Sequence, residues 1–313
     1  MRRITVILVN YHNTNDTYNC VKSIIANYHD ISVIVVNNSP SDTELLSCLS
    51  NISNVKLIQS PYNLGFSQGN NLGIQWSLQN SDSNFFFILN NDTIVDNNTI
   101  ELLEKSLDTH PEAGIAVPRI VFMHDNELLW YGGGEVCWLR GGGMVPGYLG
   151  PSTSALAMQP RYVSFASGCA MLVRREVFDT LKGFHPDFFM YEEDLEFSLR
   201  TQNMGWKIHY EPLALVKHKV QASSSKDDYF IGMLSPSNTN LSFYTFHLFR
   251  NRLINMQIHA KGKRRFLFYL GFSLFNIKTA LTYLSHRRWD GLVAMIKAWK
   301  AYFDYLNNNR TIS

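Results

Sequence analysis

Amide and acidic side chains directly follow a strongly apolar segment in the first third of the chain. Phe85–Leu89 is a run of large apolar residues, and Asn90, Asn91 and Asp92 come next. An apolar run of this length, bounded by turn-forming residues, predicts a strand buried on both faces. Ligands bind at the carboxyl ends of strands in open α/β sheets, and a carboxylate two residues after a neutral oxygen ligand suits a divalent cation that carries phosphate. The alternative is an ordinary turn, which Asn and Asp both favour.

A second acidic group lies near residue 193. Glu192, Glu193 and Asp194 follow an aromatic-rich segment and begin a predicted helix that runs to Met204. One interpretation is helix capping, because acids at this end stabilise the macrodipole. The other is catalysis, because apolar neighbours that desolvate a carboxylate raise its pKa and make it a better general base. His218 ends a later predicted strand and is a further candidate, although a lone histidine there is more often structural.

Alternating strands and helices would position these groups. The predicted elements are, in order, strand Ile4–Val9, helix 16–26, strand Ile31–Val36, helix 42–49 and strand Val55–Gln59. This alternation predicts a parallel, doubly wound α/β sheet. Asn10 and Asn37 follow the first two strands, so the strand-end rule predicts that this half of the chain binds a nucleotide.

Two glycine-rich stretches interrupt the pattern. Residues 63–74 are expected to connect a strand to a helix, where glycine would let the backbone approach a ligand and a helix N-terminus would bind phosphate. Their spacing does not match the dinucleotide-binding or P-loop motifs, and capping glycines explain the stretch equally well. Tyr131–Pro160 is predicted to contain no regular element, and to be either a functional loop or a long surface connection.

The composition excludes several classes of protein. The 313 residues are 45% hydrophobic and carry a net charge of +2, which predicts a globular core and gives no indication of nucleic-acid binding. Four scattered cysteines form no zinc or redox motif and favour a reducing compartment. The N-terminus is not a signal peptide, and no apolar stretch reaches the ~18 residues that a membrane-spanning helix needs. We therefore expect a cytoplasmic protein.

The C-terminal part of the chain is predicted to be helical and is rich in basic and aromatic residues. Arg250–Arg252 is a basic cluster, and basic residues at 261–265 and 287–288 flank an aromatic run, Phe266–Phe275. Basic residues beside amphipathic helices favour an anionic membrane surface, whereas the alternative is packing of these helices on the catalytic domain. The predicted domains are 1–240, divided at about residue 121, and a helical region at 241–313.

Taken together, these segments resemble the family 2 glycosyltransferases, which have the GT-A fold. The matching segments, in matching order, are VILVNYH, NLGFSQGNNLGI, FFFILNND, SGCAMLVRREVF, GFHPDFFMYEEDLEFSLR and VKHKVQASSS. Within that family the chain is similar to the rhamnosyltransferase-like enzymes of bacterial surface polysaccharide assembly, such as O-antigen and capsule. The resemblance covers about residues 4–252 and implies a donor-binding half at about 1–121 and an acceptor half at about 122–240.

The resemblance implies catalytic roles for individual residues. Asp92 matches the last acid of the family's DxD-type metal motif, and His218 matches a later ligand of the same Mg²⁺ or Mn²⁺ ion. Asp194 matches the general base of the family's ED motif, and Glu193 and Tyr191 would contact the acceptor.

The resemblance also implies a nucleotide-sugar site. Its residues are Asn10, Tyr11 and Asn37 at the nucleobase, Gly65 and Asn70 in the cleft, and Asn90. Asn90 stands where the metal motif's first acid can be, so it would contact the metal or the donor ribose. Asn37 departs from the family, because many members have an aspartate there that reads the pyrimidine. An amide still hydrogen-bonds a base edge, but the departure leaves the donor nucleotide open.

The implied function is inverting, metal-dependent transfer of a sugar from a nucleotide donor to a hydroxyl of a lipid-linked or polysaccharide acceptor. Rhamnose from dTDP-rhamnose is the first expectation, and a UDP-hexose is the alternative. The expected location is the inner leaflet of the cytoplasmic membrane, peripherally bound, with no nucleic-acid partner. A catalytically inactive glycan-binding module is a different class, which Asp92, Asp194 and His218 together disfavour. A nucleotidyltransferase would be expected to have a basic, glycine-rich first loop, which VNYHNTND is not.

Overall fold

The protein forms two compact units. The computed structural model describes residues 4–41, 48–49, 52–220, 234–236 and 238–310. The first unit comprises Met1–Glu135, Met144–Phe189 and Glu193–Val220, and the second comprises Val136–Gly143, Met190–Glu192 and Gln221–Ser313. The boundaries of these units therefore differ from the predicted division at residue 240. The helix predicted at 42–49 lies largely outside the described residues.

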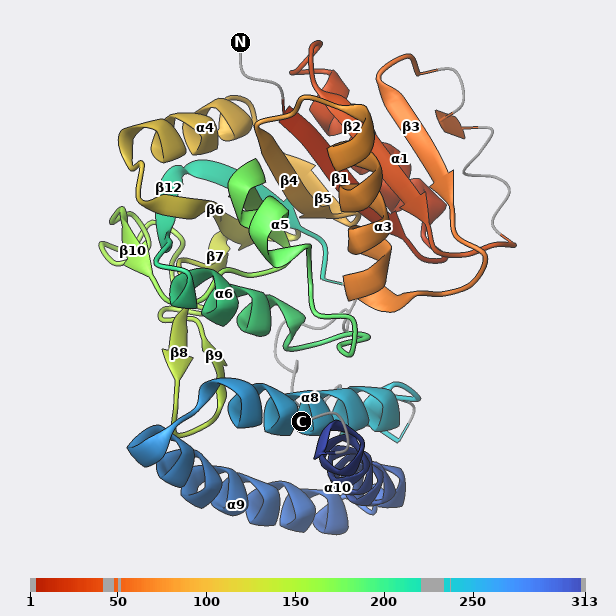
Figure 1. Ribbon diagram of the computed structural model, residues 1–313, viewed down its shortest axis with the longest axis vertical. Coiled ribbons are helices and arrows are strands. Elements are labelled where there is room, and N and C mark those ends of the chain that lie inside the picture. The colour runs from red at the N-terminus through yellow and green to blue at the C-terminus, as the bar shows by residue number, and fades with distance from the viewer. Residues whose placement is uncertain (1–3, 42–47, 50–51, 221–233, 237, 311–313) are drawn as a thin grey trace. The chain divides into compact units, whose positions relative to one another are not determined.

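The first unit is built on one large β-sheet with the strand order β10-β12-β6-β11-β4-β1-β2-β3, in which β5 also pairs with β12 and β7 with β6 (Figure 1). The strands are β1 (Ile4–Asn10), β2 (Ser32–Asn37), β3 (Val55–Gln59), β4 (Phe85–Asn90), β5 (Thr93–Val95), β6 (Ala113–Phe122), β7 (Asp125–Tyr131), β10 (Arg161–Val163), β11 (Ala170–Arg174) and β12 (Lys207–His218). Strands β4, β1, β2 and β3 are parallel, as predicted. Strand β11 runs antiparallel between β4 and β6, so the other half of the sheet is mixed.

Helices cover both faces of this sheet. They are α1 (Thr14–Ile25), α3 (Gly65–Asn80), α4 (Thr99–Thr109), α5 (Arg175–Leu181) and α6 (Glu193–Asn203). A Cβ atom on Gly73 of α3 would lie 2.7 Å from Ile7 of β1, whereas Thr17 of α1 donates a hydrogen bond to Asn10 of the same strand. Residues 7 and 10 point to opposite faces of a strand, so α1 and α3 lie on opposite sides of β1. This is the doubly wound arrangement that the sequence predicts.

The predicted strand at Phe85–Leu89 is the centre of the core. All five side chains are at most 2% exposed, because β4 lies between β1 and β11 and both of its faces are covered. Phe86 packs edge-on against Phe178 of α5, with 5.7 Å between the ring centroids. The strand therefore holds the polar residues that follow it at a fixed place on the sheet edge.

The glycine-rich stretch at 63–74 is mostly helical, so the prediction that it connects a strand to a helix is wrong. Only residues 63 and 64 precede the helix, because α3 begins at Gly65 and continues beyond residue 74. Gly69 and Gly73 face the sheet, where a Cβ on Gly69 would lie 3.0 Å from Val9. These glycines let α3 approach β1 closely, and burial of the helix offsets the roughly 1 kcal/mol that each glycine costs a helix relative to alanine.

The prediction that Tyr131–Pro160 contains no regular element is wrong. Strands β8 (Glu135–Cys137) and β9 (Gly142–Met144) pair as a small two-stranded sheet. Three glycines fall within and beside β9, so neither a periodic pattern nor side-chain propensity marks the pair in the sequence.

The second unit is mainly helical, as predicted. It contains α8 (Leu241–His259), α9 (Gly262–Ser285) and α10 (Trp289–Arg310). Phe249 of α8 stacks on Phe275 of α9, with ring centroids 5.4 Å apart, and Trp299 of α10 lies against Phe272 of α9. Within the described ranges, none of the helices combines the length and the apolar character that a membrane span requires.

Candidate active site

Pairing of two strands brings Asp92 and His218 together. Asp92 lies in the turn between β4 and β5, and Thr93 at the start of β5 pairs with His218 at the end of β12. The Nε2 atom of His218 is 3.2 Å from Oδ1 of Asp92. Lys219 donates its backbone N–H to the Asp92 carbonyl over 2.9 Å, which fixes the turn. The two predicted metal ligands, far apart in the sequence, are neighbours at one sheet edge.

The side chains of Asp92 and His218 fit the ligands of a divalent cation that arrives bound to the substrate. Both side chains are mostly buried, and Nδ1 of His218 has no hydrogen-bond partner among the described residues. The described chain brings no group of three or more His, Cys, Asp or Glu side chains together in a way that would hold a metal ion. Mg²⁺-type sites commonly use one or two protein ligands and fill the remaining positions with phosphate oxygens and water. The pair therefore fits a metal–diphosphate complex better than a permanently bound ion.

Asp194 is held at the start of α6 by backbone N–H groups. Its Oδ2 accepts a hydrogen bond from Gly168 over 3.0 Å, and its Oδ1 accepts one from Leu195 over 2.8 Å. A Cβ atom on Gly168 would lie 3.3 Å from the Asp194 Cβ, tighter than most such contacts, so a glycine there gives the carboxylate room. Both carboxylate oxygens thus have a fixed direction.

Asp92 and Asp194 both lie near the carboxyl end of β4. The residue after Gly168 is Cys169, whose carbonyl accepts the N–H of Asn90 over 2.8 Å. Burial raises the pKa of the Cys169 thiol well above its ordinary value, and the negative charges of Asp92 and Asp194 raise it further. Both carboxylates therefore lie within electrostatic range of one buried sulfur atom.

The amides at the ends of β1 and β2 form a buried chain of hydrogen bonds. Asn10 Nδ2 donates to Asn37 Oδ1 over 3.0 Å, and Asn37 Nδ2 donates to Gln59 Oε1 at the same distance. Asn10 and Asn37 are fully buried, whereas Tyr11 is 50% exposed. Of these predicted nucleotide-site residues, Tyr11 alone presents its side chain to solvent.

Two other predicted donor-site residues lie on α3. Gly65 has a φ of +72°, and the next N–H, of Phe66, donates to the carbonyl of Phe189 over 2.8 Å. Asn70 is buried; its Nδ2 donates to the Phe66 carbonyl over 2.9 Å, and its Oδ1 has no partner in the described parts of the chain. Gly65 therefore ties α3 to the segment before α6, and a role toward a ligand stays a prediction for both residues.

The two residues predicted to contact the acceptor belong to different units. Glu193 is buried at the start of α6. Tyr191 belongs to the second unit, where its ring lies edge-on to that of Tyr244 at 5.1 Å between centroids. Asn90 ends β4 beside the Asp92 turn.

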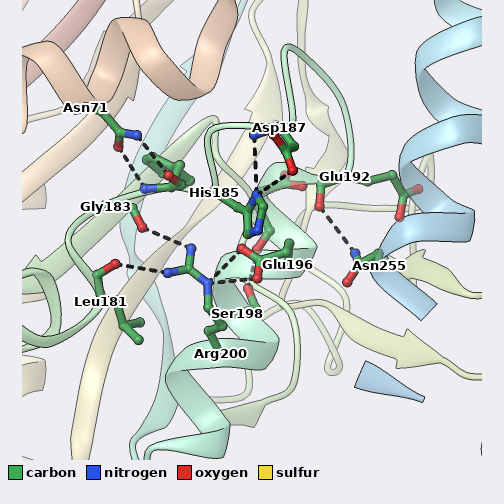
Figure 2. Close-up of polar contacts among 12 residues, drawn as sticks. Asn71, Leu181, Gly183, His185, Asp187, Glu192, Glu196, Ser198, Arg200 and Asn255 are labelled. Atoms are coloured by element: carbon green, nitrogen blue, oxygen red, sulfur yellow. Dashed lines mark hydrogen bonds and ion pairs between the residues drawn. The ribbon is translucent and has the colours of Figure 1, made fainter. Parts of the chain in front are cut away.

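A buried ion pair that sequence reasoning missed supports α6. Arg200 Nε donates to both oxygens of the fully buried Glu196, over 2.7 and 2.9 Å. Figure 2 shows its other nitrogens donating to the carbonyls of Leu181 and Gly183, over 3.1 and 2.9 Å. The i,i+4 spacing of Glu and Arg is the available sequence signal, but it normally indicates an exposed helix surface.

Asn71 of α3 fixes the segment that leads to α6 in the same way. Its Nδ2 donates to the carbonyl of Phe184 and its Oδ1 accepts the N–H of Phe184, both over 2.8 Å (Figure 2). A Cβ atom on Gly183 would meet the Asn71 side chain, and Gly183 has a φ of +107°. The carboxylate of Asp194 is therefore presented by a chain segment that polar side chains hold along its length.

Comparison with known proteins identifies the family. Residues 5–182 match the model of Glycosyl transferase family 2, so the chain belongs to this family. A low-salt glycan biosynthesis hexosyltransferase, Agl10, from Haloferax volcanii is 27% identical over 199 residues, which are 64% of this chain and 61% of that protein. An N-acetylglucosaminyl-diphospho-decaprenol L-rhamnosyltransferase from Mycobacterium tuberculosis is 27% identical over 221 residues, 65% of this chain and 71% of that protein.

Solved structures identify the fold as GT-A. A mannosyltransferase from Pyrobaculum calidifontis in complex with GDP-Man and Mn²⁺ has a TM-score of 0.57 and 13% identity, covering 97% of this chain and 88% of the other. GalNAc-T7 with UDP, GalNAc and Mn²⁺ has a TM-score of 0.56 and 17% identity, covering 69% and 43%. The predicted family and fold class are thereby confirmed.

Proposed function

We propose that this chain is an inverting glycosyltransferase that moves a sugar from a nucleoside-diphosphate donor to an acceptor hydroxyl. The observation that carries the proposal is the presence of two differently held carboxylates near the carboxyl end of β4. Asp92 faces an imidazole, and Asp194 is oriented by two backbone N–H groups. Membership of the family supports the same reaction.

Asp194 is the proposed general base. As the acceptor oxygen attacks the anomeric carbon, its proton passes to Asp194, and the bond from that carbon to the nucleoside diphosphate breaks. One displacement inverts the configuration, and no covalent enzyme intermediate forms. The Gly168 and Leu195 N–H groups keep the carboxylate oriented, which is the condition for efficient proton transfer.

Asp92 and His218 are the proposed protein ligands of Mg²⁺ or Mn²⁺. When bound, the ion would neutralise negative charge that develops on the leaving diphosphate. Two structural neighbours were solved with Mn²⁺ and a nucleotide or nucleotide sugar, which supports this assignment. Asn90, at the end of β4, is the proposed contact to the metal or to the donor ribose.

dTDP-rhamnose is the first proposed donor, because the mycobacterial relative is named a rhamnosyltransferase. A UDP-hexose is the alternative, because the haloarchaeal relative is named a hexosyltransferase and Asn37 replaces the aspartate of many family members. Asn10 and Asn37 already hydrogen-bond each other, so the exposed ring of Tyr11 is the side chain best placed to meet a nucleobase.

A lipid-linked glycan at the inner leaflet of the cytoplasmic membrane is the proposed acceptor. The mycobacterial relative's name specifies a decaprenol-linked acceptor. In the second unit, α9 has an apolar stripe in which each of the residues Leu267, Leu270, Leu274, Ile277, Leu281 and Leu284 is exposed. The helix contains no acidic residue and begins with basic ones at 263–265. An apolar stripe beside basic residues matches an anionic lipid surface.

Release of nucleoside diphosphate from a panel of sugar nucleotides tests this function. The assay contains Mn²⁺ or Mg²⁺ and a polyprenyl-diphosphate glycan acceptor. We expect turnover with one donor, with dTDP-rhamnose as the first candidate, and loss of turnover in Asp194→Asn. Absence of turnover with every donor would contradict the enzyme and favour a binding module.

A further inference from the structure

Two consecutive residues just before Glu193 have an unusual backbone conformation. Tyr191 has a φ of +68° and Glu192 a φ of +69°. The left-handed region is costly for residues with a Cβ atom, and glycine is the usual occupant. Such conformations persist only where the surroundings hold them, and they concentrate at functional sites.

Asn251 of α8 holds the first part of this segment. Its Nδ2 donates to the carbonyls of both Met190 and Tyr191, each over 2.9 Å. Asn251 is fully buried, and its Oδ1 accepts a hydrogen bond from Arg250 over 2.7 Å. Because Arg250 is a donor only, this contact determines which end of the amide faces the two carbonyls.

Arg252 and Asn255 of the same helix hold Glu192. Arg252 donates through Nε and Nη2 to Oε1 of Glu192, over 3.0 and 2.6 Å. Asn255 Nδ2 donates to the Glu192 carbonyl over 3.4 Å (Figure 2). That carbonyl belongs to the peptide bond that joins Glu192 to Glu193. All three carbonyls of Met190–Glu192 are thus bound by side chains of α8.

The Glu192–Arg252 contact is a buried ion pair. The Glu192 side chain is 6% exposed and that of Arg252 is 13% exposed. Burial raises the pKa of Glu192, and the charge and hydrogen bonds of Arg252 oppose that rise. A Cβ atom on Gly142 would lie 2.6 Å from Arg252 Nη2, so the hairpin between β8 and β9 leaves room for the guanidinium. Removing either partner would leave a buried charge without compensation.

We infer that Asn251 and Arg252 are positioning residues for Asp194, an inference that rests on the proposed function. Asp194 is two residues after Glu192, so the conformation of Met190–Glu192 determines how the chain enters the first turn of α6. Stability alone would be served more simply by glycines at the two left-handed positions. The chain instead has two residues with side chains there and dedicates buried polar groups to their carbonyls.

The first test measures catalysis and donor binding separately. Asn251→Asp keeps the shape of the side chain and removes both donated hydrogen bonds, and Arg252→Lys keeps the charge but loses the paired contact. We expect kcat to fall about 10- to 100-fold in Asn251→Asp and less in Arg252→Lys, with the Kd for the nucleoside diphosphate unchanged. Asn80→Asp is the matched control, because its amide also donates to a carbonyl, but at an exposed site. An unchanged kcat in Asn251→Asp, or an equal loss in the control, would overturn the inference.

The second test does not depend on activity. Hydrogen exchange of peptides that cover residues 190–196 is compared between wild type and Asn251→Asp, both checked by circular dichroism. We expect faster exchange in these peptides and unchanged exchange in β1 and β4. Unchanged exchange at 190–196 would overturn the inference even if no donor is turned over, whereas absence of wild-type turnover with faster exchange would contradict the proposed function alone.

Discussion

The two carboxylates at the sheet edge are held in opposite ways. Asp194 receives backbone N–H groups on both oxygens, whereas Asp92 faces the imidazole of His218, whose other nitrogen lacks a partner among the described residues. A carboxylate fixed by the backbone keeps its direction through a reaction. A buried carboxylate–imidazole pair with an unsatisfied atom is suited to rearrange around a bound cation. This difference is the basis of the proposed division of roles, with proton transfer at Asp194 and metal binding at Asp92.

The largest effect is expected at Asp194, where a substitution should reduce turnover without weakening donor binding. Asp194→Asn removes the proton acceptor and keeps the shape of the side chain, so kcat should fall about 10³-fold while the Kd for the donor stays within a factor of two. Single-turnover kinetics and calorimetry measure the two quantities. Near wild-type turnover would remove Asp194 from the role of base.

At Asp92 the expected effect falls on binding. Asp92→Ala should weaken donor binding in the presence of Mn²⁺, because one of the two protein ligands is lost. EDTA should weaken binding to wild type and leave Asp92→Ala nearly unaffected. Calorimetry of both proteins, with and without EDTA, decides the point, and equal affinities in all four titrations would refute the metal role.

A smaller effect is expected at the exposed face of α9. Leu274→Glu places a charge in the apolar stripe and should reduce flotation with vesicles that contain phosphatidylglycerol by roughly tenfold. Leu213→Glu is a matched control, because Leu213 and Leu274 are both 62% exposed and Leu213 lies on β12 of the first unit. Equal flotation of the two variants would count against a membrane role for this face.

The smallest expected effect is on the stability of the folded chain at acidic pH. Burial, together with the charge of His110, lowers the pKa of His209 to about 4. Between about pH 6.5 and 4 the unfolded chain therefore binds a proton that the folded chain does not, so stability falls as the pH falls. His209→Gln should flatten the melting temperature across this range and leave kcat at pH 7.5 unchanged. The exposed His124→Gln is the control, and an unchanged pH slope in His209→Gln would contradict this explanation.

The sequence was sufficient for the central strand and for the grouping of Asp92 with His218. The apolar run at Phe85–Leu89 is long and bounded by turn residues, so its burial follows from the pattern. The family resemblance, rather than periodicity, joined His218 to Asp92. It also suggested Asp194, but the N–H groups that orient this carboxylate belong to the backbone of Gly168 and Leu195, so no side-chain type marks them in the sequence.

Other features depend on long-range contacts that no local pattern encodes. The early start of α3 does not follow from the sequence, because its glycines face the sheet, and a glycine-rich stretch is typical of a loop unless the strand against it is known. From the sequence, Arg250–Arg252 is predicted only to be a basic cluster in a helix. In the structure Arg252 pairs with Glu192, which lies 60 residues earlier in the sequence. Arg250 orients its neighbour Asn251 within α8.

The stereochemistry of the first-formed product tests the central claim most directly. Wild-type enzyme is incubated with its donor and acceptor, and proton NMR follows the anomeric signal of the new linkage from the start of the reaction. A single displacement assisted by Asp194 predicts a product whose anomeric configuration is opposite to that of the donor. A product that retains the donor configuration would contradict the account.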